Sequence, residues 1–196
     1  MSFSEKEVLK YLNITTTILI FIYSISLIYF VLYGKTFQIS PCFCSLIITG
    51  FIKVVSKKFL DIVSPILIFA ILIFIFIASY LGSSFDFYGI VSHYDDIMHF
   101  LSGILATLFG YDLFKILNSK NVDIYKNRKL IVSFVFFFNL SIAGLWEIFE
   151  FLIDKFFLTK MQVGGLNDTM IDMIDALLAS IILILSYEFF IKKINK

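Results

Sequence analysis

Long apolar runs separated by short charged segments dominate the pattern of the chain. A helix that crosses the hydrocarbon core of a bilayer needs roughly 20 apolar residues, because all of its backbone polar groups must be satisfied within the helix. The pattern therefore predicts an all-α integral membrane protein with about six transmembrane helices in one bundle. The expected helices lie near residues 12–32, 40–56, 64–82, 96–117, 129–153 and 169–191.

The first two runs differ from the other four. The run at 12–32 follows two lysines, as a secretory signal would, but it is too long for the apolar part of a signal and lacks a small-residue cleavage site. We expect it to be a retained helix. The second run opens with Ser40 and Pro41, a pair typical of an N-cap and a first helical turn. It is short and ends in a lysine cluster, so it is either a short spanning helix or a half-inserted one.

Composition agrees with this reading. Hydrophobic residues make up 60% of the 196 residues, and 25 residues are Phe. This apolar share is far above that of soluble domains, and no repeat or soluble segment is visible, so we expect a single polytopic membrane domain over residues 1–196. The net charge of +1 and the lack of a basic stretch interleaved with aromatics argue against a nucleic-acid partner. Cys42 and Cys44 are too close for an easy disulfide, and buried thiols are the favoured interpretation.

The distribution of charge predicts an orientation. Thirteen of the 16 Lys and Arg residues fall in cytoplasmic segments if the N- and C-termini are cytoplasmic, and Lys35, Lys155 and Lys160 then lie outside. Such an excess of basic residues on one side is the positive-inside signal. Nine of the 15 acidic residues divide the other way, toward the outer side.

Most of these outer acids lie inside the apolar runs, in pairs spaced three residues apart. The pairs are Asp96/His99, Glu147/Glu150 and Asp172/Asp175. Residues three apart on a helix share a face, and small residues such as Gly103 and Ala143 continue two of these faces, which permits close helix packing. Because the helix at 129–153 runs opposite to its two neighbours, all three pairs reach similar depth. We therefore expect one polar cluster near the outer leaflet.

An ionised carboxylate at the bilayer centre costs about 2.5–3.5 kcal/mol, and clustered carboxylates also repel one another. No Lys or Arg lies within these faces to neutralise them, so bound cations, protons or a water-filled cavity must do so. Carboxylates with an imidazole suit Mg, Mn, Zn or Fe. The candidate divalent-metal ligands are Asp96, His99, Glu147, Glu150, Asp172 and Asp175.

Three functional classes remain open. A metal-dependent hydrolase or transferase acting on lipid headgroups or lipid-linked phosphates would use Glu150 or His99 as the catalytic base. A cation or proton-coupled transporter would use the same acids as an ion site, but it also needs a polar path to the cytoplasmic side. The inner halves of the helices are strongly apolar, and only Asn139 and Asp112 interrupt this apolar region. A non-catalytic sensor or scaffold would leave the acid pairs without a role.

Neighbouring polar residues have simpler interpretations. Asp95 and Asp168 stand where helices are expected to begin, and we interpret both as N-caps. His93 precedes a helix in a polar loop and is a further possible ligand. Trp146 lies at the level expected for an interfacial aromatic belt.

A resemblance to a known family emerges from the order of these motifs. The segments Tyr94-Asp95-Asp96-Ile97-Met98-His99 and Trp146-Glu147-Ile148-Phe149-Glu150, followed by Asn167-Asp168-Thr169 and Asp172, resemble the YjdF-like bacterial inner-membrane proteins over about residues 60–190. A more distant similarity is to VanZ-like proteins, although Glu150 stands where those proteins are expected to carry an amide. The resemblance implies a multi-pass protein of the bacterial plasma membrane, without implying a particular activity.

Overall fold

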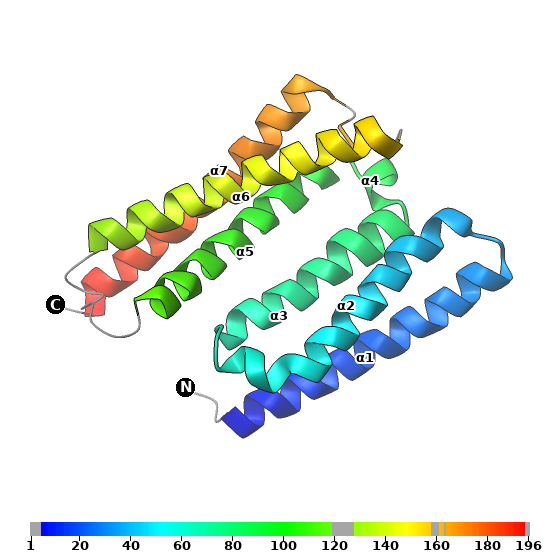
Figure 1. Cartoon of the computed structure of the whole chain (residues 1–196), viewed down its shortest axis with the longest axis horizontal. Helices are drawn as coiled ribbons and strands as arrows, with labels where there is room; N and C mark the ends of the chain where they lie inside the picture. Colours follow the sequence, from blue (N-terminus) through cyan, green and yellow to red (C-terminus); the bar gives the residue numbers. More distant parts are fainter. Residues whose placement is uncertain (1–4, 119–127, 158–160, 163, 195–196) are drawn as a thin grey trace. The chain divides into compact units, whose positions relative to one another are not determined.

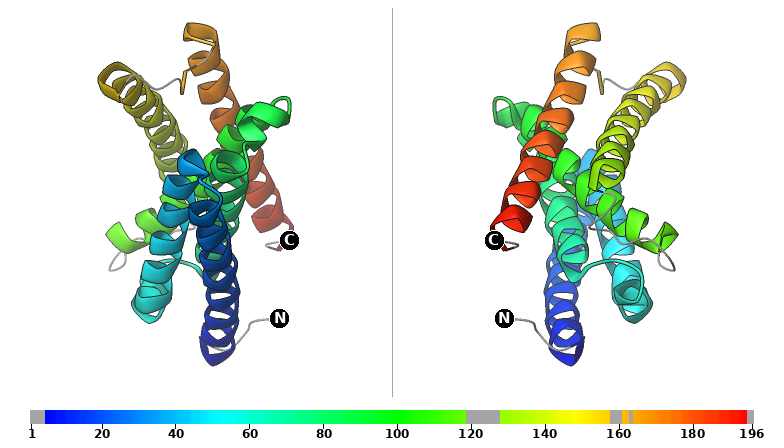
Figure 2. Two further views of the ribbon diagram at one scale, coloured as in Figure 1. Left: turned by 90° about the vertical axis from the view of Figure 1, so that its right-hand side faces the viewer. Right: turned by 90° about the vertical axis from the view of Figure 1, so that its left-hand side faces the viewer.

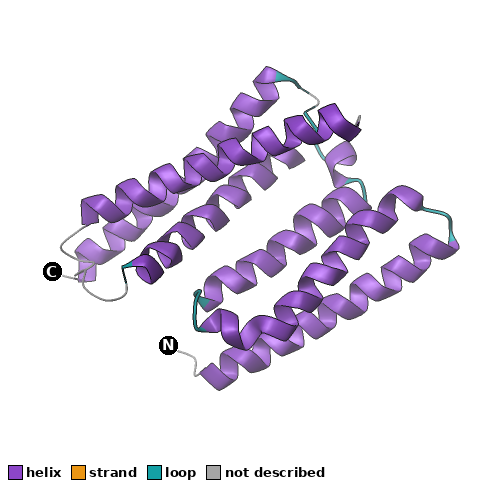
Figure 3. Cartoon of the chain, viewed as in Figure 1, coloured by secondary structure: helices purple, strands orange, loops and turns teal. Residues whose placement is uncertain are grey.

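The described part of the chain is helical, with short connections between the helices. The computed structural model describes residues 5–118, 128–157, 161–162 and 164–194, and no strand occurs in these ranges (Figures 1 and 3). The elements are α1 (Glu5–Leu32), α2 (Thr36–Leu60), α3 (Pro65–Phe74), η1 (Ile75–Ser84), α4 (Phe87–Ile90), α5 (Tyr94–Leu117), α6 (Arg128–Phe157) and α7 (Leu166–Ile194).

Within the described residues, six helical segments are long and apolar enough to cross a membrane. They are Glu5–Leu32, Thr36–Lys58, Pro65–Ser84, Tyr94–Leu117, Arg128–Phe157 and Leu166–Phe189. The third segment combines α3 with η1, a continuous stretch of π-helical hydrogen bonding. Large apolar side chains cover the outside of the helices, and Phe37 and Val54 are 91% and 84% exposed. Such a surface is stable against lipid rather than water, so the prediction of an all-α protein with six candidate membrane spans is confirmed.

The second helix departs from its predicted start. It begins at Thr36, and Pro41 lies inside it rather than in the first turn. The prediction that Ser40 and Pro41 start the helix is therefore wrong. A proline this close to the N-terminus removes one backbone hydrogen bond without ending the helix. The Pro41 carbonyl accepts hydrogen bonds from Ser45 Oγ (2.9 Å) and Ser79 Oγ (3.1 Å). With its earlier start the helix is long enough to span.

The two cysteines lie on different faces of α2. Cys42 is buried and Cys44 is exposed, and neither forms a disulfide. Two residues along a helix correspond to a rotation of about 200°, which separates the side chains. The buried-thiol interpretation therefore holds for Cys42 and is wrong for Cys44.

By its contacts the chain divides into two compact units, Met1–Tyr94 and Asp95–Lys196, here called unit 1 and unit 2. The core of unit 1 is formed by buried residues of α1, α2 and η1: Tyr23, Phe30, Cys42 and Tyr80. The helix α1 ends at Leu32, and Gly34 follows it with a φ of 65°, a left-handed conformation that glycine adopts without strain, while Lys35 N donates to Phe30 O (2.8 Å). This Schellman turn leads directly into α2.

Unit 2 contains α5, α6 and α7, with α6 antiparallel to the other two (Figure 1). The helix α7 crosses behind α6 in Figure 1, and the C-terminal end of α6 and the N-terminal end of α7 are spread apart (Figure 2). At Gly103 the backbone of α5 packs against α7, because a Cβ there would lie 2.3 Å from the Ala176 carbonyl oxygen. This close approach of small residues holds the polar faces of the two helices together.

The two ends of unit 2 differ in charge. At the end where α6 begins, Arg128 Nη2 donates to Glu188 Oε2 (2.6 Å) and Arg128 Nε donates to Glu188 Oε1 (3.3 Å). Lys115 lies on α5 near the same end, 3.4 Å from Asp112. We call this the basic end of unit 2. The opposite, acidic end carries the first turns of α5 and α7 and the last turns of α6.

Candidate metal centre

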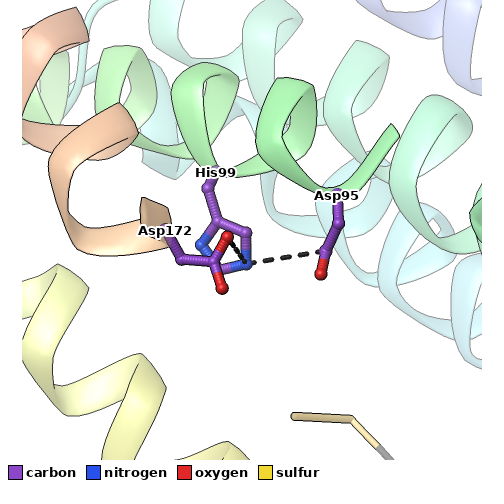
Figure 4. Close-up of side chains that lie close together, drawn as sticks. All are labelled: Asp95, His99 and Asp172. Atoms are coloured by element: carbon purple, nitrogen blue, oxygen red, sulfur yellow. Dashed lines mark ion pairs between the residues drawn. The ribbon is translucent and has the colours of Figure 1, made fainter. Parts of the chain in front are cut away.

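His99 is the residue around which the acidic end is arranged. It lies in the second turn of α5 and is only 7% exposed. Its Nε2 atom is 3.6 Å from Asp95 Oδ1 and 3.7 Å from Asp172 Oδ1, and Figure 4 shows the imidazole between these two carboxylates. Its Nδ1 atom is 3.9 Å from Glu147 Oε1. Both ring nitrogens therefore face carboxylates from other turns or other helices.

Five residues form two overlapping groups with ligand atoms within 4.8 Å of one another. One group is Asp95, His99 and Asp172, and the other is His99, Glu147 and Glu150. We call these five residues the His99 cluster. Four of them are buried and Asp95 is half-buried. Imidazole nitrogens and carboxylate oxygens at these separations can hold a divalent cation.

Within the described residues, only one of the two carboxylate oxygens of Glu147 is held by a hydrogen bond. Its Oε2 atom accepts a hydrogen bond from Gln162 Nε2 (3.3 Å), which also donates to Thr169 Oγ1 (2.9 Å). Gln162 is itself positioned by Asp154, whose carboxylate accepts from the backbone N–H groups of Met161 and Gln162. The Oε1 atom of Glu147 is buried and has no hydrogen-bond partner among the residues that the structure describes.

Glu150 is held by a tryptophan one turn earlier on α6. Trp146 Nε1 donates to Glu150 Oε1 at 2.8 Å, although the Trp146 side chain is 48% exposed. One edge of the indole ring therefore contacts the buried cluster, while the rest of the ring lies on the exposed surface of α6. Trp146 therefore does more than contribute to an aromatic belt, because its N–H fixes one Glu150 oxygen.

The structure brings together most of the predicted site residues. His99, Glu147, Glu150 and Asp172 belong to the His99 cluster, whereas Asp96 and Asp175 are half-buried and lie in neither ligand group. Asp95 takes the place expected of Asp96. It is the second residue of α5, and its carboxylate faces His99 instead of capping the helix. The spacing of four residues between Asp95 and His99 was the sequence signal for this contact.

Two other candidates belong to neither ligand group within the described residues. Asp168 is the third residue of α7, so it does not occupy the N-cap position predicted for it, although the helix dipole stabilises a carboxylate in the first turn. His93 is exposed in the connection before α5 and has a φ of 59°. It belongs to neither ligand group within the described residues.

Comparison with known proteins places the chain in a family. Residues 14–193 match the family described as "Predicted membrane protein (DUF2238)". A relative from Thermotoga maritima, described as an uncharacterized protein, is 31% identical over 104 residues, which cover 53% of this chain and 52% of the relative. The matched part thus spans about half of that relative. No solved structure matches the chain. The chain belongs to the DUF2238 family of membrane proteins.

Proposed function

We propose that the His99 cluster binds a divalent metal ion and that the protein is a metal-dependent hydrolase or transferase. Its substrates would be lipid headgroups or lipid-linked phosphates. The observation that carries this proposal is the pairing of a buried histidine with four carboxylates, one of which has an oxygen without a hydrogen-bond partner among the described residues. A buried carboxylate oxygen without a donor needs a proton or a cation.

The cluster also lacks basic partners. Among the described residues no Lys or Arg forms an ion pair with Asp95, Glu147, Glu150 or Asp172, and His99 is the group that faces them. Several carboxylates this close would repel one another if all were ionised. A divalent ion offsets that repulsion, and a cation would also be required for a negatively charged phosphate to approach.

The geometry favours the Nε2 side of His99 for the ion. Two ligands at about 2.1 Å from one metal lie roughly 3.0–3.5 Å apart, so Asp95 and Asp172 need to move inward only slightly. A metal-bound histidine ordinarily donates its other ring N–H to a carboxylate. Glu147 Oε1 stands on the Nδ1 side at 3.9 Å and can accept this bond. His99, Asp95 and Asp172 would then hold the ion, while Glu147 orients the imidazole.

Glu150 supplies the candidate base. Trp146 occupies one oxygen of its carboxylate, which leaves Oε2 to accept a proton from the attacking water or hydroxyl group. A bound divalent cation would polarise the phosphoryl oxygen under attack and stabilise the charge that develops there. In this assignment the general base is Glu150, and the role of His99 is to bind the ion.

The position of the cluster suits substrates at the membrane surface. His99 lies five residues after the start of α5, which corresponds to about 8 Å of helix. This is close to the headgroup region if α5 spans the bilayer. The charge distribution supports an outer-leaflet position for this end, and the resemblance to YjdF-like proteins favours the bacterial plasma membrane. Both locations are part of the proposal.

The experiment measures phosphate release from a short-chain lipid phosphate by the detergent-purified full chain, with Mg²⁺, Mn²⁺ or Zn²⁺ added in turn. We expect metal-dependent turnover that is abolished by Glu150→Gln, because the amide cannot accept the proton. Ser141→Ala is the matched control, since Ser141 is an exposed residue of α6 whose hydroxyl donates to the Phe137 carbonyl oxygen in its own helix. Turnover that survives Glu150→Gln would remove Glu150 from the reaction.

A further inference from the structure

A second polar layer lies in the core of unit 2. Each member lies eight residues from a residue of the His99 cluster on the same helix, in the direction of the basic end. The cluster residues are His99 on α5, Glu147 on α6 and Asp172 on α7. The members of the layer are Thr107 on α5, Asn139 on α6 and Ser180 on α7. Eight residues of helix correspond to about 12 Å. All three side chains are 0% exposed. Polar groups of three helices thus occur at one level in the interior, away from the metal centre.

The amide of Asn139 has a fixed orientation in this layer. Its Nδ2 atom donates to the Gly103 carbonyl oxygen (2.7 Å) and to Thr107 Oγ1 (3.1 Å). Thr107 Oγ1 in turn donates to the same Gly103 oxygen (2.7 Å). Since the Gly103 carbonyl can only accept, the nitrogen of the amide must face it. The opposite atom, Asn139 Oδ1, is buried and has no hydrogen-bond donor within the described residues.

Two hydroxyl groups close to this level are also without partners in the described chain, Ser180 Oγ and Tyr111 OH. Ser186 donates to the carbonyl four residues before it, as serines in helices commonly do, but Ser180 does not. Tyr111 lies one turn beyond Thr107 on α5. Long side chains of a helix lean toward its N-terminus, which for Tyr111 is the direction of the second polar layer. One acceptor and two hydroxyl donors therefore lack partners within the described core of unit 2, and the Tyr111 ring lies beyond the other two groups, against Tyr187.

These groups match the hydrogen-bonding capacity of water. A buried water molecule makes two to four hydrogen bonds. It can donate to Asn139 Oδ1 and accept from the Ser180 hydroxyl, and a further water can accept from the Tyr111 hydroxyl. A metal cation fits less well, because it would leave both hydroxyl hydrogens unpaired and no carboxylate belongs to the layer to balance its charge.

We propose that the second polar layer binds water in the membrane core and that this hydrated layer conducts protons between the two ends of unit 2. Toward the basic end, the ring of Tyr111 packs on that of Tyr187 at 4.9 Å, and the next residue, Glu188, is paired with Arg128. Toward the acidic end, the Gly103 carbonyl oxygen that accepts from Asn139 and Thr107 lies one turn of α5 from His99. Each transfer breaks one O–H bond and forms another, so that one proton moves and no electron does. This activity is independent of metal binding.

The test uses full-length protein in liposomes that enclose a pH-sensitive dye, with a potassium diffusion potential to drive protons inward. A chelator is present throughout, so that the outcome does not depend on the metal centre. We expect acidification several-fold faster than in protein-free liposomes. Asn139→Leu, Ser180→Ala and Tyr111→Phe should each reduce the rate toward that of protein-free liposomes, whereas Ser141→Ala should leave it unchanged.

Two results would overturn the proposal. The first is a wild-type rate equal to that of protein-free liposomes. The second is a wild-type rate retained in the variants with helicity and elution volume unchanged. If Asn139→Leu does not fold, Ser180→Ala and Tyr111→Phe decide the question, because each of them removes a single oxygen atom. Loss of metal binding with retained conduction would contradict the proposed enzyme and leave this inference standing.

Discussion

Glu147 Oε1 lies 3.9 Å from His99 Nδ1 and has no hydrogen-bond partner among the described residues, while the second oxygen of the same carboxylate is held by Gln162. The two side chains come from different helices, α6 and α5, and both are buried. The carboxylate is thus fixed at one oxygen and presents the other to an imidazole. In the proposed metal centre this arrangement would favour the histidine tautomer that carries its proton on Nδ1 and leaves Nε2 as a ligand.

Glu147→Gln should weaken metal binding without abolishing it. The amide keeps the shape of the side chain but is a poorer acceptor for the Nδ1 proton, and loss of such an outer partner costs about 10–100-fold in metal affinity. Titration calorimetry with Mn²⁺ and Zn²⁺ measures the change, with Ser141→Ala as the control. An affinity equal to that of the wild type would show that Glu147 does not orient His99. Complete loss of binding would instead make Glu147 a direct ligand.

Gly103→Ala should destabilise unit 2. A Cβ at this position would lie 2.3 Å from the Ala176 carbonyl oxygen and 2.7 Å from the Ala176 Cα, and backbone cannot move aside cheaply. We expect a loss of about 1–3 kcal/mol, as for other overpacked cores. The measurement is unfolding in detergent, followed by circular dichroism.

Gly50→Ala is the matched control for that variant. Gly50 also lies inside a helix, but a Cβ there would meet nothing within 4 Å. Alanine has the higher helix propensity, so this change should be neutral or stabilising by up to about 1 kcal/mol. Equal effects of the two substitutions would mean that α5 and α7 do not approach closely at Gly103.

The excess of basic residues on one side predicts the orientation of the first two helices. Lys35 is exposed between α1 and α2, and Lys57 is exposed near the end of α2. After replacement of the two native cysteines by serine, Lys35→Cys should react with a membrane-impermeant thiol reagent in intact cells. Lys57→Cys should react only after the membrane is opened. The reverse pattern would place the termini outside and the His99 cluster at the inner leaflet.

The helices could be predicted from sequence because hydrophobic length is a strong signal in a chain of this kind. The start of α2 could not, since Ser40 and Pro41 have the features of a helix start. Five residues from Thr36 to Ser40 form a turn before the proline, which a proline so near the N-terminus tolerates. Helix ends depend on such local hydrogen bonds, which composition does not reveal.

The candidate site was predicted in part. The spacing of the acidic residues identified the acidic faces of α6 and α7, but on α5 it pointed to Asp96 instead of Asp95. Asp95 and Asp96 both lie about one turn before His99, and only the packing of the helices distinguishes them. Gln162 could not be found from sequence at all. It reaches Glu147 because Asp154 holds the backbone at residues 161 and 162, a relationship between a helix and a connection that has no periodic signature.

The central claim is that the His99 cluster holds one divalent metal ion, and its most direct test is the metal content of the full-length protein after equilibrium dialysis against Mn²⁺ or Zn²⁺. We predict close to one ion per chain in the wild type and in Ser141→Ala. His99→Gln and Asp172→Asn, which keep the side-chain volumes nearly constant, should hold almost none. A wild-type protein that retains no metal above the dialysis buffer, or variants that retain as much as the wild type, would contradict the claim.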